Sequence, residues 1–121
     1  MDKQELMVRT KQFAHRCVKL AGSLPHTVLG NHIRNQLIRS STSVACNYRA
    51  VCYSQSRASF ISKLAIVIEE SDESCFWIEF IIEEDLIKKE RIQPLLNEAE
   101  ELKAIFIASR KTATRNVKTK V

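Results

Sequence analysis

The sequence has very little glycine and proline, two residues of each in 121. Because turns depend on these two residues, an all-β sandwich or barrel, which needs many turns, is nearly excluded. The same scarcity excludes the glycine-rich loops that hold phosphate groups in nucleotide-binding folds. With 45% hydrophobic and 27% charged residues, the composition is that of a folded domain. We therefore expect a small all-α domain.

A long apolar segment is also missing. The most apolar stretches, residues 60–68 and 75–82, are interrupted by Lys63 and Glu79. Both stretches are shorter than the ~18 residues that a membrane span requires. The amino terminus is charged throughout, unlike a secretory signal. These features predict a soluble, cytoplasmic protein with no membrane partner.

The spacings typical of metal sites and catalytic centres do not occur. No two cysteines form a Cys-x-x-Cys pair, and the three histidines stand at unrelated positions. No histidine follows a glutamate by three residues, which argues against a di-metal carboxylate bundle. An arrangement of acid, base and nucleophile is likewise lacking. We expect buried, reduced thiols and a protein that has no metal, no cofactor and no enzymatic activity.

Charge is distributed unevenly along the chain, although the formal net charge is only +5. Residues 1–54 contain eight Lys and Arg against two Asp and Glu, and residues 55–109 contain six against twelve. Residues 110–121 contain five basic residues and no acid. A chain that is basic at one end and acidic in the middle can pair with itself, within a subunit or between subunits.

Apolar residues recur at helical spacing in four segments. This periodicity predicts helices over about residues 2–22, 27–53, 57–87 and 93–112. Thr27 and Ser56 are suitable N-caps, and Pro94 suits the first turn of the last helix. The short connections favour an antiparallel up-down-up-down four-helix bundle over residues 1–112, followed by a basic C-terminal tail over residues 113–121.

The third predicted helix has apolar residues on two faces. One stripe consists of Phe60, Leu64, Val67, Ile68, Cys75, Ile78, Ile82 and Leu86. A second stripe projects roughly opposite and consists of Ile66, Trp77, Phe80 and Ile81. A helix of a monomeric bundle should present one face to water. We therefore predict that the second stripe is the subunit interface of a homo-oligomer.

The central segment combines several short patterns: Ser43-Val44, Asn47-Tyr48-Arg49, Ser56, Phe60, Lys63-Leu64, Glu69-Glu70, Glu73 and Trp77-Ile78-Glu79. In this combination the chain resembles a small bacterial family, the four helix bundle proteins, also called ribosomal RNA intervening-sequence proteins. The resemblance covers essentially the whole length. Many relatives have an acidic residue directly after the Asn-Tyr-Arg triplet, where this chain has Ala50. Any salt bridge through that position is therefore absent here.

The resemblance implies a four-helix bundle that assembles as a ring, a homopentamer. It also implies a distant similarity to the accessory variability determinant of diversity-generating retroelements. That protein is a basic pentameric barrel that binds nucleic acid and a reverse transcriptase. Such a transfer is an analogy at the level of the fold, and a fold does not fix a function.

The basic residues are the strongest functional signal, and two interpretations of them stay open. In the first, they bind the phosphate backbone of RNA or DNA with little sequence preference. The residues expected to do so are Lys11, Arg16, Arg34, Arg39, Arg49, Arg110 and Lys111. In the second, they form an ordinary basic surface that the acidic third helix partly neutralises. The alternative function is a scaffold that docks a protein partner such as a polymerase and touches nucleic acid only incidentally. The Asn47-Tyr48-Arg49 triplet is open in the same way, as a nucleic-acid contact or as part of a polar line that joins helices.

Overall fold

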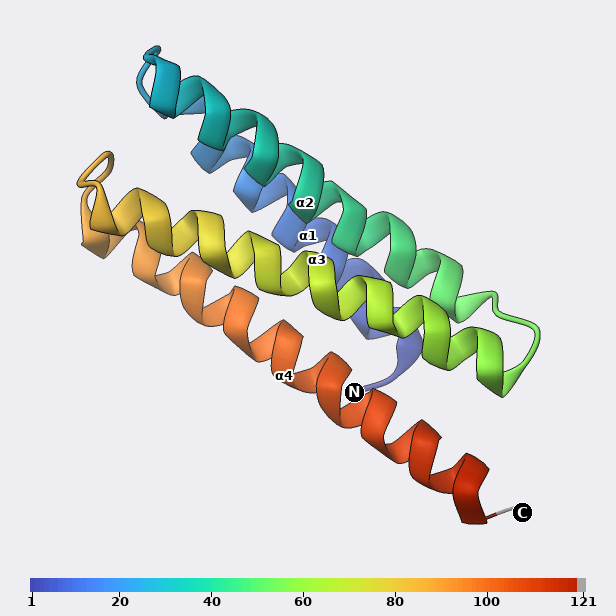
Figure 1. Ribbon diagram of the computed structural model, residues 1–121. Helices are drawn as coiled ribbons and strands as arrows, with labels where there is room; N and C mark the ends of the chain where they lie inside the picture. Colours follow the sequence, from blue (N-terminus) through green and yellow to red (C-terminus); the bar gives the residue numbers. More distant parts are fainter. Residues whose placement is uncertain (120–121) are drawn as a thin grey trace.

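The computed structural model describes the backbone of residues 1–119 and the side chains of residues 1–116. This part of the chain forms four helices: α1 (Lys3–Gly22), α2 (Val28–Cys52), α3 (Arg57–Glu83) and α4 (Lys89–Thr119). Successive helices run in opposite directions (Figure 1). α1 packs on α2, α2 on α3 and α3 on α4, while α4 meets α1 along a sparser seam. The predicted antiparallel four-helix bundle is confirmed.

Side-chain caps begin the first three helices. Asp2, Thr27 and Ser56 each accept a hydrogen bond from the backbone N–H three residues further on, at 2.8–3.0 Å. Each of these bonds pairs one of the N–H groups that a helix start leaves without an intrahelical acceptor. The two predicted N-caps, Thr27 and Ser56, are confirmed.

α3 ends at Glu83, four residues before the predicted boundary. Asp85 adopts a left-handed backbone conformation with φ of 54°. The backbone N–H groups of Asp85 and Leu86 donate to the carbonyls of Ile82 and Ile81, each at 3.1 Å. These two bonds are a Schellman closure, which pairs the last carbonyls of a helix. Leu86 continued the apolar pattern because it packs on the core from the turn.

α4 is longer than predicted at both ends, since it starts at Lys89 rather than 93 and continues to Thr119 rather than 112. Pro94 therefore lies inside the helix and not at its first position. A proline in the second turn removes one hydrogen bond, the one to the carbonyl four residues earlier, and the helix continues past it. At the other end Ala113 is buried, which holds the additional turns to the bundle. Of the predicted tail, residues 113–119 are helical, and residues 120–121 lie outside the described part of the chain.

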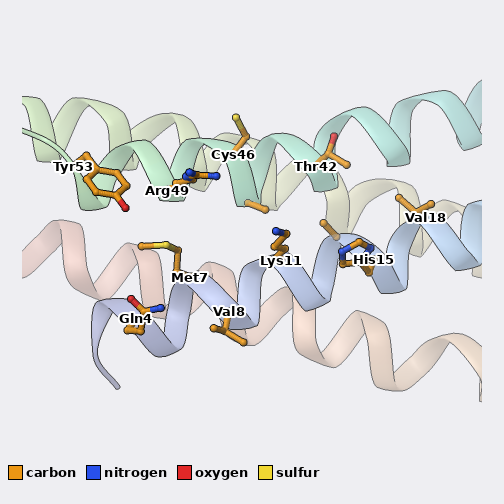
Figure 2. Close-up of a pocket in the computed structure, with 12 residues that line it drawn as sticks. Gln4, Met7, Val8, Lys11, His15, Val18, Thr42, Cys46, Arg49 and Tyr53 are labelled. Atoms are coloured by element: carbon orange, nitrogen blue, oxygen red, sulfur yellow. The ribbon is translucent and has the colours of Figure 1, made fainter.

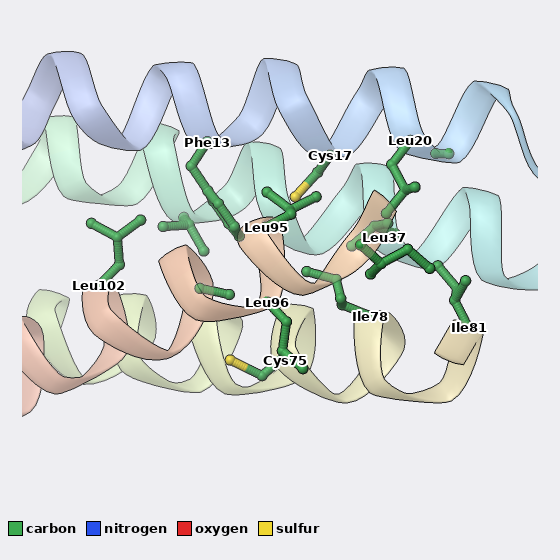
Figure 3. Close-up of a cluster of buried hydrophobic side chains, with 14 of the residues drawn as sticks. Phe13, Cys17, Leu20, Leu37, Cys75, Ile78, Ile81, Leu95, Leu96 and Leu102 are labelled. Atoms are coloured by element: carbon green, nitrogen blue, oxygen red, sulfur yellow. The ribbon is translucent and has the colours of Figure 1, made fainter. Parts of the chain in front are cut away.

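Apolar side chains from all four helices fill the space between them (Figure 3). In α3 the core positions Leu64, Val67, Ser71, Ser74, Ile78 and Ile81 are spaced alternately by three and four residues, and Cys75 is buried beside them. Ile81 is 0% exposed, so its prediction as a subunit-interface residue is wrong. Two of the core positions are serines, and a hydrophobic pattern does not detect them. Because the two serines are not apolar, the predicted core stripe of α3 follows a repeat of 3.6 residues. The observed repeat is 3.5 residues, and the predicted stripe therefore ends at Ile82 instead of Ile81.

Candidate functional site

Arg34 is placed at the turn between α1 and α2, where the protein's own carbonyls surround its guanidinium. Nε donates to the carbonyl of Ala21 at 3.1 Å, and Nη2 donates to those of Leu24 and Pro25 at 2.6 and 3.3 Å. Nη1 donates to the side chain of Asn31. Because every nitrogen of the guanidinium is engaged in this way, Arg34 fixes the turn and does not present a free charge to a phosphate.

Arg39 is neutralised by two carboxylates of α3. Nη1 lies 3.0 Å from Oε2 of Glu70, and Nη2 contacts Oε2 of Glu73. Glu73 also accepts a hydrogen bond from the indole N–H of Trp77 at 3.1 Å. The Arg39 side chain is 48% exposed, so the ion pairs contribute little stability. They do cancel its charge, as expected of a basic surface that the acidic third helix partly neutralises.

Lys11 and Arg49 border an open groove of about 630 Å³ between the outer faces of α1 and α2 (Figure 2). The α1 side of the groove presents Val8, Lys11, His15 and Val18, and the α2 side presents Thr42, Cys46, Arg49 and, at its end, Tyr53. No carboxylate among the described residues lines it. Val8 is 49% exposed, and Val18 and Tyr53 are exposed as well. The two basic side chains thus lie beside an apolar channel rather than on an open charged face.

A second set of basic side chains gathers at one end of the bundle. Arg110 and Lys111 are exposed on α4, whose last turns extend past the other helices (Figure 1). Lys3 and Arg57 line a hollow at the same end, beside Ala113 of α4. None of these four forms an ion pair with another described residue. We refer to Lys3, Arg57, Arg110 and Lys111 as the basic end.

The basic end contains two residues that were not predicted to bind phosphate. Lys3 and Arg57 are far from Arg110 in the sequence, and the antiparallel order of the helices brings them to one end. In an antiparallel four-helix bundle, the start of α1, the start of α3 and the end of α4 lie at the same end. The predicted helix order was therefore enough to place Lys3 and Arg57 near the end of α4. Arg16, the remaining predicted ligand, is exposed on α1 outside the groove.

The outer face of α3 carries three of the four predicted interface residues. Ile66 is 44% exposed, and Trp77 and Phe80 are half-buried. Phe76, which is 50% exposed, belongs to the same face and was missed. The ring of Trp77 lies 4.9 Å from that of Phe76, with the two planes nearly perpendicular, and 5.4 Å from that of His32. α3 therefore presents an aromatic cluster to solvent.

Burial keeps two of the thiols protonated. It raises the pKa of Cys17 to about 12 and that of Cys75 to about 11. Cys46 is exposed and Cys52 partly so. Among residues 1–119 no group of three or more His, Cys, Asp or Glu side chains is placed to hold a metal ion. In the same part of the chain, no helix combines the length and apolarity needed to cross a bilayer.

Residues 2–108 match a family model described as 23S rRNA-intervening sequence protein. The chain belongs to this family. The intervening sequence protein is also similar to a solved structure, that of a protein with unknown function from the S23 ribosomal protein family of Bacteroides thetaiotaomicron. The two are 30% identical with a TM-score of 0.81, and the match covers 92% of this chain and 99% of that one. No curated protein matches the sequence.

Family membership confirms the resemblance drawn from the central segment and agrees with the helical fold. The match ends at residue 108, before Arg110 and Lys111. Arg110 and Lys111, half of the basic end, therefore lie on a part of α4 outside the matched residues.

Proposed function

We propose that this intervening sequence protein is a non-enzymatic, cytoplasmic, homo-oligomeric bundle that binds the phosphate backbone of RNA or DNA with little sequence preference. The observation that carries the proposal is the basic end, where Lys3 and Arg57 line one hollow and Arg110 and Lys111 line another, all four without ion-pair partners among the described residues. Cations on flexible side chains contact phosphates without reading bases. The acidic residues nearest to Lys3 in the sequence are Asp2 and Glu5, and the side chain of Asp2 already accepts the capping hydrogen bond of α1.

The structure narrows the set of proposed phosphate ligands. Arg34 and Arg39 have partners within the subunit, and Lys11 and Arg49 border the groove. We therefore assign the principal contacts to Arg110 and Lys111, supported by Lys3 and Arg57. Arg16 on α1 is an additional exposed cation.

Self-association is supported by the outer face of α3, where Ile66 and Phe76 leave apolar surface in water. Such surface on a protein of this size is typical of a subunit contact. The family resemblance implies five copies in a ring. Repetition would multiply the basic end and strengthen its attraction for a polyanion.

A scaffold that docks another protein is the second candidate function, and the groove between α1 and α2 favours it. Apolar side chains such as Met7, Val8 and Val18 line this channel together with polar ones at its borders, as in grooves that receive an amphipathic helix. This candidate needs no direct contact with nucleic acid.

Fluorescence anisotropy with a structured RNA and a DNA duplex, titrated at two salt concentrations, tests the proposal. We expect binding that weakens steeply with salt because bound phosphates release counterions. The double variant Arg110→Glu/Lys111→Glu should bind far more weakly, with a slope of log K against log salt that is smaller by roughly 2.

The matched control is Lys88→Glu/Lys89→Glu, which makes the same charge change at the opposite end of α4, where both lysines are exposed. This control should retain more of the affinity. Equal losses in the two variants would show that only net charge matters. An absence of binding at low salt would leave the scaffold as the better explanation.

A further inference from the structure

We propose that the groove between α1 and α2 of one copy binds the outer face of α3 of a second copy, so that subunits associate head to tail. This inference rests on the homo-oligomer of the proposed function and is independent of its nucleic-acid binding. It joins two surfaces that the bundle leaves uncovered, and it identifies which side chains meet.

The shape of the groove is suited to binding a helix. On α1, Val8, Lys11, His15 and Val18 follow one another at spacings of three or four residues, which places them on one stripe. On α2, Thr42, Cys46 and Arg49 form the facing stripe, which continues to Tyr53. Between the stripes lie small side chains, Ala14 and Ala45, which allow close approach. From Val8 to Val18 the groove is about 15 Å long, which matches nearly three turns of a docked helix.

The outer face of α3 forms a ridge of side chains, called the ridge below, that is suited to bind in this groove. Its outward residues also recur at spacings of three and four: Glu69, Glu73, Phe76, Phe80 and Glu83. Phe76 projects furthest into solvent, with half of its surface exposed. Its ring lies 4.9 Å from that of Trp77 and 5.8 Å from that of Phe80. These contacts fix the ring before a partner arrives, so little side-chain freedom is lost on docking.

Charge determines which surfaces pair. The groove is bordered by Lys11 and Arg49, and no carboxylate lines it. On α3 the exposed Glu69 and Glu83 flank the aromatic residues, while the carboxylate of Glu73 is already paired with Arg39. Groove against groove would bring cations together, and α3 against α3 would bring Glu69 and Glu83 of both copies together. Groove against α3 is the one combination of the two surfaces in which opposite charges face each other.

An interface made of two different faces has a distinct consequence for assembly. Each subunit keeps one face free after the first contact, so association continues until the rotation between neighbours closes a ring. A contact between identical faces would stop at a dimer.

The experiment uses two variants, each of which disables one face. Val8→Glu/Val18→Glu places carboxylates in the groove, and Phe76→Glu places one on the ridge. All three positions are exposed, so we expect both variants to fold, which circular dichroism verifies. In analytical ultracentrifugation each variant alone should sediment as a single subunit, whereas the wild-type protein forms a larger particle. Gln12→Glu, an added charge on α1 outside the groove, is the control that should assemble normally.

The decisive measurement is an equimolar mixture of the two variants. One intact groove and one intact ridge remain in the mixture, on different chains, so a 1:1 heterodimer should form and nothing larger. If no heterodimer forms, or if the groove variant alone assembles like the wild type, the head-to-tail contact is wrong, although the homo-oligomer stands. If the wild-type protein itself sediments as a single subunit at tens of micromolar, both the inference and the homo-oligomer fall. The RNA titration of Arg110→Glu/Lys111→Glu is unaffected by either result.

Discussion

At Gly30 a single Cβ decides whether the first turn of α2 fits against the preceding loop. A Cβ built there would lie 2.0 Å from the backbone oxygen of Pro25 and 3.1 Å from Oγ1 of Thr27. Helix propensity alone counts a glycine at this position as unfavourable by about 1 kcal/mol relative to alanine. The Pro25 carbonyl that crowds Gly30 also accepts a hydrogen bond from Nη2 of Arg34 at 3.3 Å, so neither side can move freely.

Replacement of Gly30 by alanine should therefore destabilise the protein, opposite in sign to the propensity scale. We expect Gly30→Ala to lower the free energy of unfolding by more than about 1 kcal/mol, since a backbone contact must be displaced. Gly22→Ala is the matched control, because a Cβ at Gly22 meets nothing within 4 Å. Urea denaturation of both variants tests the difference. Equal stabilities would mean that the α1–α2 turn adapts readily.

At the scale of elements, the seam between α1 and α4 depends on one arginine. Arg9 donates from Nε and Nη2 to the two carboxylate oxygens of Glu98 at 2.7 and 2.6 Å. Nη2 also lies 3.1 Å from Glu101. The hydrogen bonds that Arg9 donates to Glu98 are the main reason why the pKa of Arg9 is raised. Two parallel bonds between charged groups that are only 18% exposed hold this sparse seam closed.

Glu98→Gln should open this seam more easily than the rest of the bundle. We expect the free energy of unfolding to fall by about 1.5–3 kcal/mol, the range for hydrogen bonds that involve charged groups. Amide hydrogen exchange should accelerate in α4 more than in α2, since α2 is held by neighbours on both sides. Glu100→Gln, at an exposed position without an ion pair among the described residues, should leave both measurements unchanged. Uniform acceleration in all helices would contradict a local role for Arg9.

The sequence predicted the four helices and their order because apolar periodicity and caps such as Thr27 are local signals. The register of α3 was not predictable from hydrophobicity, since Ser74 occupies a core position and donates to Ser40 of α2 at 3.0 Å. Long-range partners were equally invisible. The charge of Arg39 is cancelled by residues more than thirty positions away, and the basic end exists only once the helices are antiparallel. The composition therefore predicted that the protein has a basic surface, and only the fold shows which basic residues belong to it.

For the molecule as a whole, the buried thiols set a limit on stability at high pH. Burial raises the pKa of Cys17 to about 12 and of Cys75 to about 11, against an ordinary value near 9 in the unfolded chain. Burial also raises the pKa of Tyr48. The folded protein thus keeps protons that the unfolded chain loses. Its stability is intact below pH 9 and declines as the pH rises from 9 toward 12.

We expect the free energy of unfolding of Cys17→Ala to depend less steeply on pH between 9 and 11 than that of the wild type. One proton fewer is involved, which amounts to at most about 1.4 kcal/mol per pH unit. Guanidinium denaturation at several pH values measures this slope. The comparison concerns slopes because the smaller side chain also lowers stability at every pH. Parallel curves for the two proteins would show that Cys17 ionises equally in both states.

Arg110 and Lys111 lie on α4 and do not line the groove between α1 and α2, and this separation matters for binding. If neighbouring copies fill each other's grooves, Arg110 and Lys111 stay outside the contact, because neither lines the groove and both lie on α4 rather than α3. Assembly then increases the number of phosphate-binding sites per particle, and the subunit contacts do not cover Arg110 and Lys111. A polyanion long enough to reach several subunits gains from a high effective local concentration at each further contact, whereas a short oligonucleotide does not. The oligomer would therefore prefer long nucleic acids to short ones without contacting any base, because the groove and the Arg110–Lys111 surface are at different places on the bundle.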